Sequence, residues 1–304
     1  MFSSFPHTCR ARAPIRTASI GAAEVDAALG PPHTGRSQRA SAWALGAILI
    51  GSLTGNAYGG AGECVARSST PPQPVVELFT SEGCSSCPPA DQWLSRVRNG
   101  APGRQAPIIL SLHVDYWNDL GWSDPWSQRR FTERQQRYSE IAASQGVYTP
   151  QVLVSGKELR DWRNIDNGET LNQMAQVAGD ASPVPTLDLT LLARSEQALR
   201  VRVNVERQGI HLPPHTTLVL ARTLDALDSR VTAGENRDHV LHHDGVVNDW
   251  VSLPLADQQE RVSATLALRP VTAGKNAHLV AFLQDPANGR VLQALSLPID
   301  NCHP

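Results

Sequence analysis

The chain has almost no excess of charge of either sign. It carries 27 Lys and Arg against 29 Asp and Glu, a net charge of −2, and no polybasic block in its body. This balance argues against a surface for nucleic acid or anionic membrane. There is also no internal repeat, which argues against a solenoid or propeller. The 41% hydrophobic and 18% charged residues are typical of folded globular protein.

Long hydrophobic runs are also lacking. The apolar run at 42–53 is about a dozen residues, too short to span a bilayer comfortably and about right for the core of a signal peptide. Arg36 and Arg39 precede it, and small residues follow through Gly59. We therefore predict a leader over residues 1–59 with the signal peptide near 36–59. The mature chain is then periplasmic or secreted, with no stable membrane anchor after processing. The alternative is an uncleaved anchor.

Cysteine is scarce, with five residues in 304. Cys9 leaves with the predicted leader, and the remaining four would enter an oxidising compartment, where disulfides form. The close pair Cys84 and Cys87 most naturally bonds to itself. Cys64 and Cys302 can then link the two ends of the mature chain, which contributes about 4 kcal/mol in the chain-entropy model. The alternative is that Cys64 and Cys302 stay unpaired in the tails.

Alternating strand-like and helix-like segments follow a Pro-rich linker at residues 60–73. The predicted order is β-α-β-α-β with a further helix, which indicates an α/β domain over residues 74–181. Its segments are strands at 75–80, 107–114 and 151–154, and helices at 88–99, 126–143 and 168–178. Ser123 and Asp124 are the predicted N-terminal cap of the second helix.

The pattern changes after Pro183. Short apolar or alternating runs, separated by polar or Gly/Pro breaks, predict an antiparallel β-sandwich over residues 182–300. The predicted strands are 186–192, 198–205, 216–221, 262–268, 278–283 and 291–297.

The Cys84-Ser85-Ser86-Cys87 segment lies between the first strand and the first helix. There the backbone N–H groups of Ser86 and Cys87 can stabilise a Cys84 thiolate. We predict that Cys84 is the exposed attacking thiol and Cys87 the buried resolving one. Glu77, in the strand beneath, is the predicted proton acceptor for Cys87. The alternative for Glu77 is an outward-facing carboxylate without a catalytic role.

Other readings of the cysteine pair stay open. It can be a purely structural bridge, or part of a zinc site, although we identify no second Cys-x-x-Cys pair and no His-x₃₋₅-His spacing to complete one. No metal and no organic cofactor are therefore predicted.

A strand, a Cys-x-x-Cys helix and a later Thr-Pro before a strand resemble the thioredoxin superfamily. The resemblance implies that Thr149-Pro150 is a cis bond facing the dithiol, with Thr149 offering its backbone to substrate. The alternative is an ordinary trans proline at the start of a strand.

A second resemblance rests on the stretches 76–91, 113–118, 121–125, 146–151 and 234–236. It covers residues 74–297 and is to the DUF1223 family of bacterial secreted thioredoxin-like proteins. It implies an α/β thioredoxin-like domain followed by an antiparallel β-sandwich-like domain. The family name itself records an unknown function.

An aromatic and acidic loop follows the second strand. It begins at the carboxyl end of that strand, where open α/β sheets place their sites. We predict that Trp117, Tyr148, His113 and Asp115 contact substrate beside the dithiol, and that His113 or Asp115 tunes its acidity.

The function predicted from these features is thiol–disulfide exchange with protein substrates. Electrons would come from a redox partner protein. The alternative is a non-catalytic binding module, or one that holds Cu(I) between both sulfurs and His113, since thiolates suit soft ions.

Overall fold

The computed structural model describes residues 64–100, 106–144, 146–165, 170–171, 173, 183–256, 259–270 and 276–302. The predicted leader, the first part of the linker and most of the predicted helix at 168–178 lie outside these residues. None of the helices in the described part is long and apolar enough to cross a membrane.

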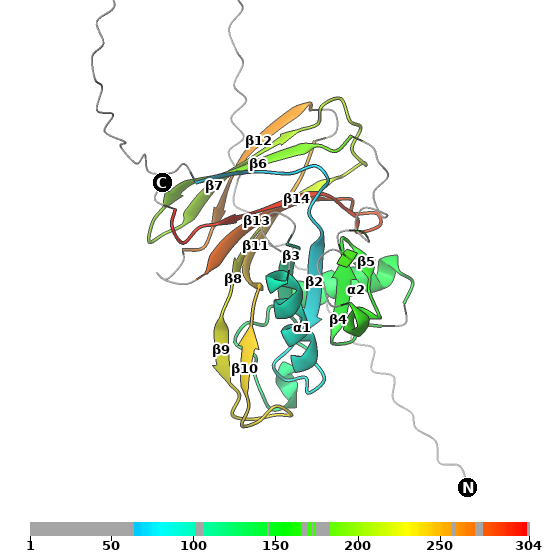
Figure 1. Cartoon of the computed structure of the whole chain (residues 1–304), viewed down its shortest axis with the longest axis vertical. Coiled ribbons are helices and arrows are strands. Elements are labelled where there is room, and N and C mark those ends of the chain that lie inside the picture. The colour runs from blue at the N-terminus through cyan, green and yellow to red at the C-terminus, as the bar shows by residue number, and fades with distance from the viewer. Residues whose placement is uncertain are drawn as a thin grey trace, which may run out of the picture.

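Strands make up most of the regular structure (Figure 1). The helices are α1 (Pro88–Asn99), α2 (Arg129–Ile141) and the short 3-10 turns η2 (Asn118–Leu120) and η3 (Trp162–Asn164). The strands of the first half are β1 (Val65–Arg67), β2 (Val75–Thr80), β3 (Ile108–His113), β4 (Gln151–Val154) and β5 (Lys157–Glu158). Those of the second half are β6 (Thr186–Arg194), β7 (Leu199–Glu206), β8 (Thr217–Leu224), β9 (Leu227–Arg230), β10 (Val240–His243), β11 (Val246–Pro254), β12 (Arg261–Leu268), β13 (Ala277–Gln284) and β14 (Val291–Pro298).

The predicted fold class, an α/β thioredoxin-like domain followed by a separate β-sandwich-like domain, is wrong. One eight-stranded sheet runs through both halves in the order β14-β13-β8-β11-β3-β2-β4-β5. Strand β3 pairs in parallel with β2 on one side and with β11 on the other. The predicted boundary between residues 181 and 182 falls outside the described residues and stays a prediction.

The physical reason for the single sheet lies in β3. All six of its residues are buried, so it cannot be left as an edge strand with unpaired backbone groups. The N–H of Ser111 donates to the carbonyl of Gly245 at 2.7 Å, immediately before β11. Strand β11 was not predicted from the sequence, and so the pairing that joins the halves was not predicted either.

A second sheet, in the order β1-β6-β7-β12, packs on the β14-β13-β8-β11 part of the large sheet. Buried Leu and Val side chains from both sheets share one apolar core. The alternation of buried and exposed residues along β7 shows why: every second residue, from Leu199 to Val205, faces this core. The six strands predicted after Pro183 are all present, as β6, β7, β8, β12, β13 and β14.

Helices α1 and α2 cover opposite faces of β2. Trp93, Leu94 and Val97 of α1 pack with Leu78, whereas Phe131 and Tyr138 of α2 pack with its neighbour Phe79. Adjacent residues of a strand point to opposite faces, so the two helices lie on opposite sides. Helix α2 begins at Arg129 and not at Trp126, and its N-cap is Gln128 and not the predicted Ser123 or Asp124. Asp124 accepts hydrogen bonds from the N–H groups of Trp126 and Glu82 and from His113.

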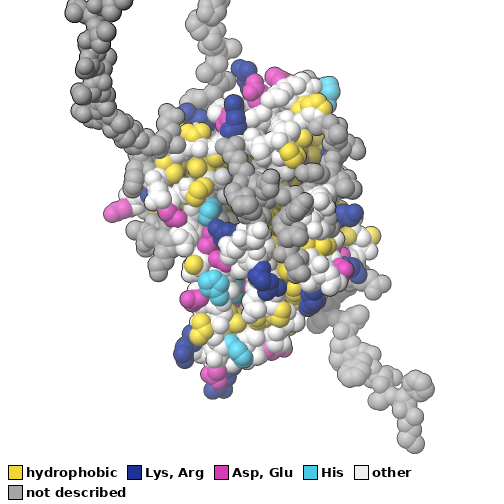
Figure 2. All heavy atoms as spheres, viewed as in Figure 1, with side chains coloured by type: hydrophobic (Ala, Val, Ile, Leu, Met, Phe, Trp, Pro, Cys, Tyr) yellow, Lys and Arg dark blue, Asp and Glu magenta, His cyan; other side chains and the backbone are white. Residues whose placement is uncertain are grey.

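Strands β9 and β10 form a two-stranded hairpin that the sequence analysis missed. In Figure 1 it projects beyond the large sheet and lies beside α1. Figure 2 shows acidic and basic side chains interspersed on this face of the molecule, without a large patch of one sign.

Replacement of Gly245 tests the junction between the halves. Its φ is +66°, and a Cβ there would lie 2.7 Å from the side chain of Ile109 in β3. We expect Gly245→Ala to lower the free energy of unfolding by about 2–4 kcal/mol, from left-handed strain plus overpacking. Gly209→Ala is the control, because Gly209 has a φ of +75° and no atom near its Cβ position. Chemical denaturation measures both, and equal losses would contradict the steric part of this account.

Candidate functional site

Cys84 and Cys87 are bonded to each other, as predicted, with their Cα atoms 5.4 Å apart. Helix α1 begins immediately after them, with Cys87 as its N-cap and Pro88 and Pro89 in its first turn. Prolines fit there because the N–H groups that they lack have no partner within a helix. The strand-to-helix position of the pair is thus as the sequence indicated.

The prediction that Cys84 is exposed is wrong, because both cysteines have no exposed surface. The segment between β9 and β10 closes over the cysteine loop. The Nδ2 of Asn236 donates to the carbonyl oxygens of Glu82 and Cys84, both at 2.9 Å. The Glu235 carboxylate accepts hydrogen bonds from the Ser85 N–H at 3.0 Å and from its hydroxyl at 2.6 Å. These hydrogen bonds hold the pKa of Glu235 below its usual value.

The donors near the Cys84 sulfur differ from the predicted ones. The N–H of Cys87 donates to the Cys84 carbonyl at 3.1 Å and is therefore not available to the sulfur. The hydroxyl of Ser86 lies 3.3 Å from the Cys84 Sγ. A hydroxyl at this distance can stabilise a thiolate by donating a hydrogen bond.

The Thr149-Pro150 bond is cis. Trp117 connects it to the cysteine loop: its Nε1 donates to the Thr149 hydroxyl at 2.8 Å, and its Cβ lies 3.1 Å from the position a Cβ of Gly83 would take. The aromatic loop therefore lies between the proline and the residue that precedes Cys84.

Glu77 does not have the predicted role. Its carboxylate is fully buried on the α2 side of β2, where it pairs with Arg134 and accepts a hydrogen bond from Tyr138 at 2.8 Å. Helix α1 and its cysteine cap are on the opposite face. The physical reason is strand alternation, since Glu77 shares the face of Val75 and Phe79.

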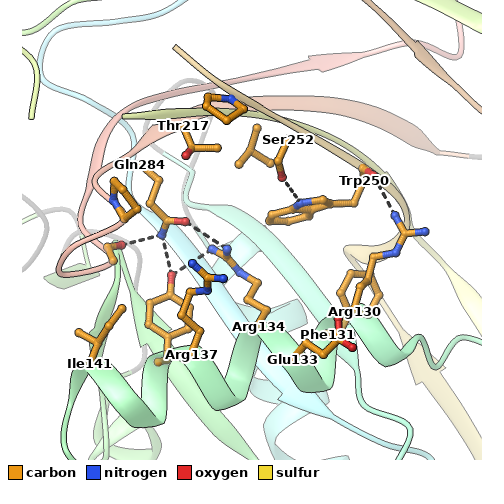
Figure 3. A pocket seen from close by; sticks show the side chains of 15 residues that line it. Arg130, Phe131, Glu133, Arg134, Arg137, Ile141, Thr217, Trp250, Ser252 and Gln284 are labelled. Atoms are coloured by element: carbon orange, nitrogen blue, oxygen red, sulfur yellow. Dashed lines mark hydrogen bonds between the residues drawn. The ribbon is translucent and has the colours of Figure 1, made fainter. Parts of the chain in front are cut away.

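A pocket of about 480 Å³ lies beside this ion pair, between α2 and strands β8, β11 and β13. Figure 3 shows Arg130, Arg134 and Arg137 projecting from α2 toward it, with Trp250 opposite. The guanidinium of Arg134 lies 4.7 Å from the centre of the Trp250 ring. This pocket is on the face away from the cysteine pair and belongs to a separate part of the molecule.

The other predicted substrate residues, Asp115, Tyr148 and His113, differ in how far they are exposed to solvent. Asp115 is half-buried and accepts a hydrogen bond from Thr132 of α2 at 2.5 Å. Tyr148 is exposed and donates to Glu158 at 2.5 Å. His113 is fully buried, so it cannot contact a substrate at the surface, contrary to the prediction.

His113 instead joins a buried group of ionisable side chains on the α1 side of the sheet. Its Nδ1 donates to Asp124 at 2.7 Å, and both side chains have no exposed surface. Burial alone would raise the pKa of Asp124. Several interactions outweigh burial and hold this pKa below its usual value. They are the electrostatic attraction of His113, the hydrogen bond from His113, and the hydrogen bonds from the backbone N–H groups of Glu82 and Trp126.

His243, at the end of β10, stands edge-on to His113 with ring centres 4.9 Å apart. Its Nε2 is 3.4 Å from Glu82, and its Nδ1 is 3.6 Å from Asp91 of α1. Burial opposes a charge on this ring, but the two carboxylates raise the pKa of His243 to about 10. We call these five residues, Glu82, Asp91, His113, Asp124 and His243, the buried cluster.

The sequence analysis missed four members of the buried cluster. Glu82, Asp91 and Asp124 lie in stretches that carried the family resemblance, but none was predicted as a site residue, and Asp124 was predicted only as a helix cap. His239 and His243 have the His-x₃-His spacing of metal ligands, a signal that was overlooked. Only His243 is buried, because it lies in β10, whereas His239 precedes that strand, is exposed and has its Nδ1 beside the carbonyl oxygens of Asn236 and Arg237.

Cys64 and Cys302 are both buried in the core between the two sheets. Their thiols interact, and burial together with the Cys64 thiol raises the pKa of Cys302 to about 12. No disulfide joins them in the described structure. The predicted bond is therefore not formed, but its partners are brought together.

Comparison with known proteins points to one family. A family model described as a protein of unknown function (DUF1223) matches residues 75–284. A crystal structure of a protein from Agrobacterium tumefaciens is similar with 25% identity and a TM-score of 0.51, over 74% of this chain and 93% of that one. HBP35 of Porphyromonas gingivalis is similar with 13% identity and a TM-score of 0.56, over 78% of each chain. No curated protein matches the sequence.

Mild oxidation tests the contact between Cys64 and Cys302. We expect a second disulfide to form, because the two thiols already interact. It would raise the free energy of unfolding by up to about 5 kcal/mol in the chain-entropy model for a loop of this size. Peptide mapping by mass spectrometry identifies the bond, and denaturation with and without oxidant measures its effect. Cys64→Ser is the control, and a gain in stability that persists in this variant would contradict the assignment.

Proposed function

The chain belongs to the DUF1223 family, whose function is unknown, and we propose that it is an exported thiol–disulfide redox protein whose reactive group is the Cys84–Cys87 bond. Its substrates would be protein thiols or disulfides, and a second redox protein would restore its oxidation state. Export is supported by the signal-peptide pattern at residues 36–59.

The observation that carries the proposal is the bond itself, formed between cysteines only three positions apart. In the chain-entropy model such a short loop stabilises the fold by only about 2 kcal/mol, much less than a bond that spans the chain. Stabilisation of the fold therefore explains the presence of this bond poorly. Its position before α1, next to Ser86 and beside Trp117, supports exchange chemistry better.

Because both sulfurs are buried, exchange requires that the segment holding Glu235 and Asn236 moves away. The contacts of this segment with the cysteine loop are a few hydrogen bonds, two of them to the exposed Ser85. Breaking such contacts at the surface costs far less than global unfolding. We propose that a partner protein, or thermal motion of this segment, exposes Cys84.

We propose that exchange occurs in two steps. A substrate thiolate attacks the Cys84 Sγ, and a disulfide bond forms between these two sulfurs. The bond between Cys84 and Cys87 breaks, and its electron pair stays on the Cys87 sulfur. The Cys87 sulfur then takes up a proton. A second substrate thiolate then attacks the substrate sulfur of the mixed disulfide and releases the Cys84 thiolate, which the Ser86 hydroxyl stabilises. The substrate is oxidised by two electrons and the protein is reduced, and a partner disulfide reoxidises it.

Trapping tests the proposal. Thiol–disulfide exchange is reversible, so in Cys87→Ser the Cys84 thiolate can attack a substrate disulfide. Without Cys87 no sulfur of the chain can then displace the substrate, so mixed disulfides with substrate proteins should accumulate. We expect these adducts on non-reducing gels of the periplasmic fraction or culture medium, and their loss after reduction. The Cys84→Ser variant is the matched control, because it removes the predicted attacking sulfur. Equal adducts from both variants, or none from Cys87→Ser, would overturn the proposal.

Removal of the Glu235 carboxylate tests the closing segment. We expect Glu235→Ala to speed reduction of the Cys84–Cys87 bond by a small reductant about tenfold, since two hydrogen bonds to a charged acceptor are lost. Arg237→Ala is the control, because this exposed neighbour only pairs with the exposed Asp238. Thiol release is followed with a chromogenic reagent. Unchanged kinetics in Glu235→Ala would show that the segment does not limit access.

A further inference from the structure

We propose that Glu82, Asp91, His113 and His243 of the buried cluster bind a divalent transition-metal ion. This site goes beyond the redox function proposed above, because it uses neither sulfur. Four separate parts of the chain supply it: the loop after β2, helix α1, the end of β3 and the end of β10.

The donor atoms are close enough for one ion. One ligand atom each from Asp91, His113 and His243 lies within 4.8 Å of the others. The Glu82 Oε1 is 3.4 Å from the His243 Nε2, close to the ~3.3 Å that separates two ligands on a tetrahedral zinc ion with bonds of about 2.0–2.1 Å. Binding would require the ligand atoms of Asp91, His113 and His243 to move closer together than 4.8 Å.

The same atoms lack hydrogen-bond partners within the described structure. They are the His113 Nε2, both ring nitrogens of His243 and the Glu82 Oε1. The exposed fraction is 0% for Glu82 and His113 and 2% for His243. A buried polar atom without a partner costs about 1–3 kcal/mol, and several in one place need an explanation. A shared metal ion would satisfy the Glu82 Oε1, the His113 Nε2 and one of the two ring nitrogens of His243.

In three of the four ligands, His113, Asp91 and Glu82, the other polar atom is held by a neighbour. The His113 Nδ1 donates to Asp124 at 2.7 Å, so its Nε2 is left as the ligand atom. The Thr80 hydroxyl donates to the Asp91 Oδ2 at 3.0 Å, and the Trp122 Nε1 donates to the Glu82 Oε2 at 2.8 Å. A carboxylate behind a ligating histidine is the usual outer arrangement of protein metal sites.

Charge favours a cation at this place. Three buried carboxylates, those of Glu82, Asp91 and Asp124, surround two imidazoles. Isolated buried carboxylates are strongly unfavourable, and a divalent ion offsets their charge. The nitrogen and carboxylate donors suit zinc, or iron, cobalt and manganese, better than calcium or magnesium, which prefer all-oxygen sites.

The rival explanation is a protonated His243 between Glu82 and Asp91. A protonated ring would offset part of the negative charge of the carboxylates. However, the His243 nitrogens lie 3.4 Å from Glu82 and 3.6 Å from Asp91, and these distances exceed those of charge-assisted hydrogen bonds. It also leaves the His113 Nε2 without a partner. A metal ion explains both observations.

Metal binding by the full chain tests the site. The protein is stripped with a chelator and titrated with Zn²⁺ by calorimetry and with Co²⁺ by visible absorption. We expect one ion per chain and a Co²⁺ spectrum of four- or five-coordinate nitrogen and oxygen ligands. His243→Gln should weaken Zn²⁺ binding at least 100-fold. Asp91→Asn, which keeps the shape of the side chain, is the second variant in case the first does not fold.

His242→Gln is the matched control, because His242 is adjacent but exposed and pairs with Asp228. It should bind Zn²⁺ as the wild type does. The Cys84→Ser/Cys87→Ser double variant should also keep its ion, which separates this site from the redox proposal. Asp124→Asn should weaken binding 10- to 100-fold and shift the Co²⁺ spectrum, as expected for a positioning residue.

Three results would overturn the site. The first is no stoichiometric Zn²⁺ or Co²⁺ binding by the wild type. The second is an equal loss of Zn²⁺ affinity in His242→Gln and His243→Gln. The third is loss of the ion in the double cysteine variant, which would assign the metal to the sulfurs instead.

Discussion

The pairing of β3 with β11 is the constraint on which the rest of the structure depends. Strand β3 is buried along its whole length, and its backbone groups need partners on both sides. Strand β2 supplies them on one side, and Val246 of β11 with Gly245 immediately before it supplies them on the other. Since β10 ends at His243, just before this junction, the pairing also fixes where the hairpin of β9 and β10 lies. The two halves of the chain are therefore one structural unit, and the site is made from both.

The hairpin contributes to the site in two ways. Asn236 and Glu235 hydrogen-bond to the cysteine loop. His243, at the end of β10, contacts Glu82 in the buried cluster. Glu82 links these two roles. Its carbonyl accepts a hydrogen bond from Asn236, and its carboxylate faces His243. Motion of the hairpin would thus act on the sulfurs and on the buried cluster together.

Much of the local structure was predictable because local patterns determine it. The buried run at Val75–Thr80, the prolines after Cys87 and the alternating strands after Pro183 all gave the elements observed. Strands β1, β5, β9, β10 and β11 were missed, and β1 lies within the predicted linker at residues 60–73. In β11, polar residues such as Asn248 and Asp249 interrupt the apolar pattern. These residues are explained by contacts with distant parts, such as the hydrogen bond from Arg222 to Asn248.

The sequence by itself determined the pairing of Cys84 with Cys87, because only three positions separate them, and the start of α1 at Pro88. The tertiary structure alone decided that both sulfurs are buried, that Glu77 faces α2 and that His113 meets His243. These outcomes depend on which face of a strand meets which neighbour, and that is set by pairing between segments that are distant in the sequence, such as β3 and β11. Spacing along the chain does not carry this information, because a shift of one position in a strand reverses its faces.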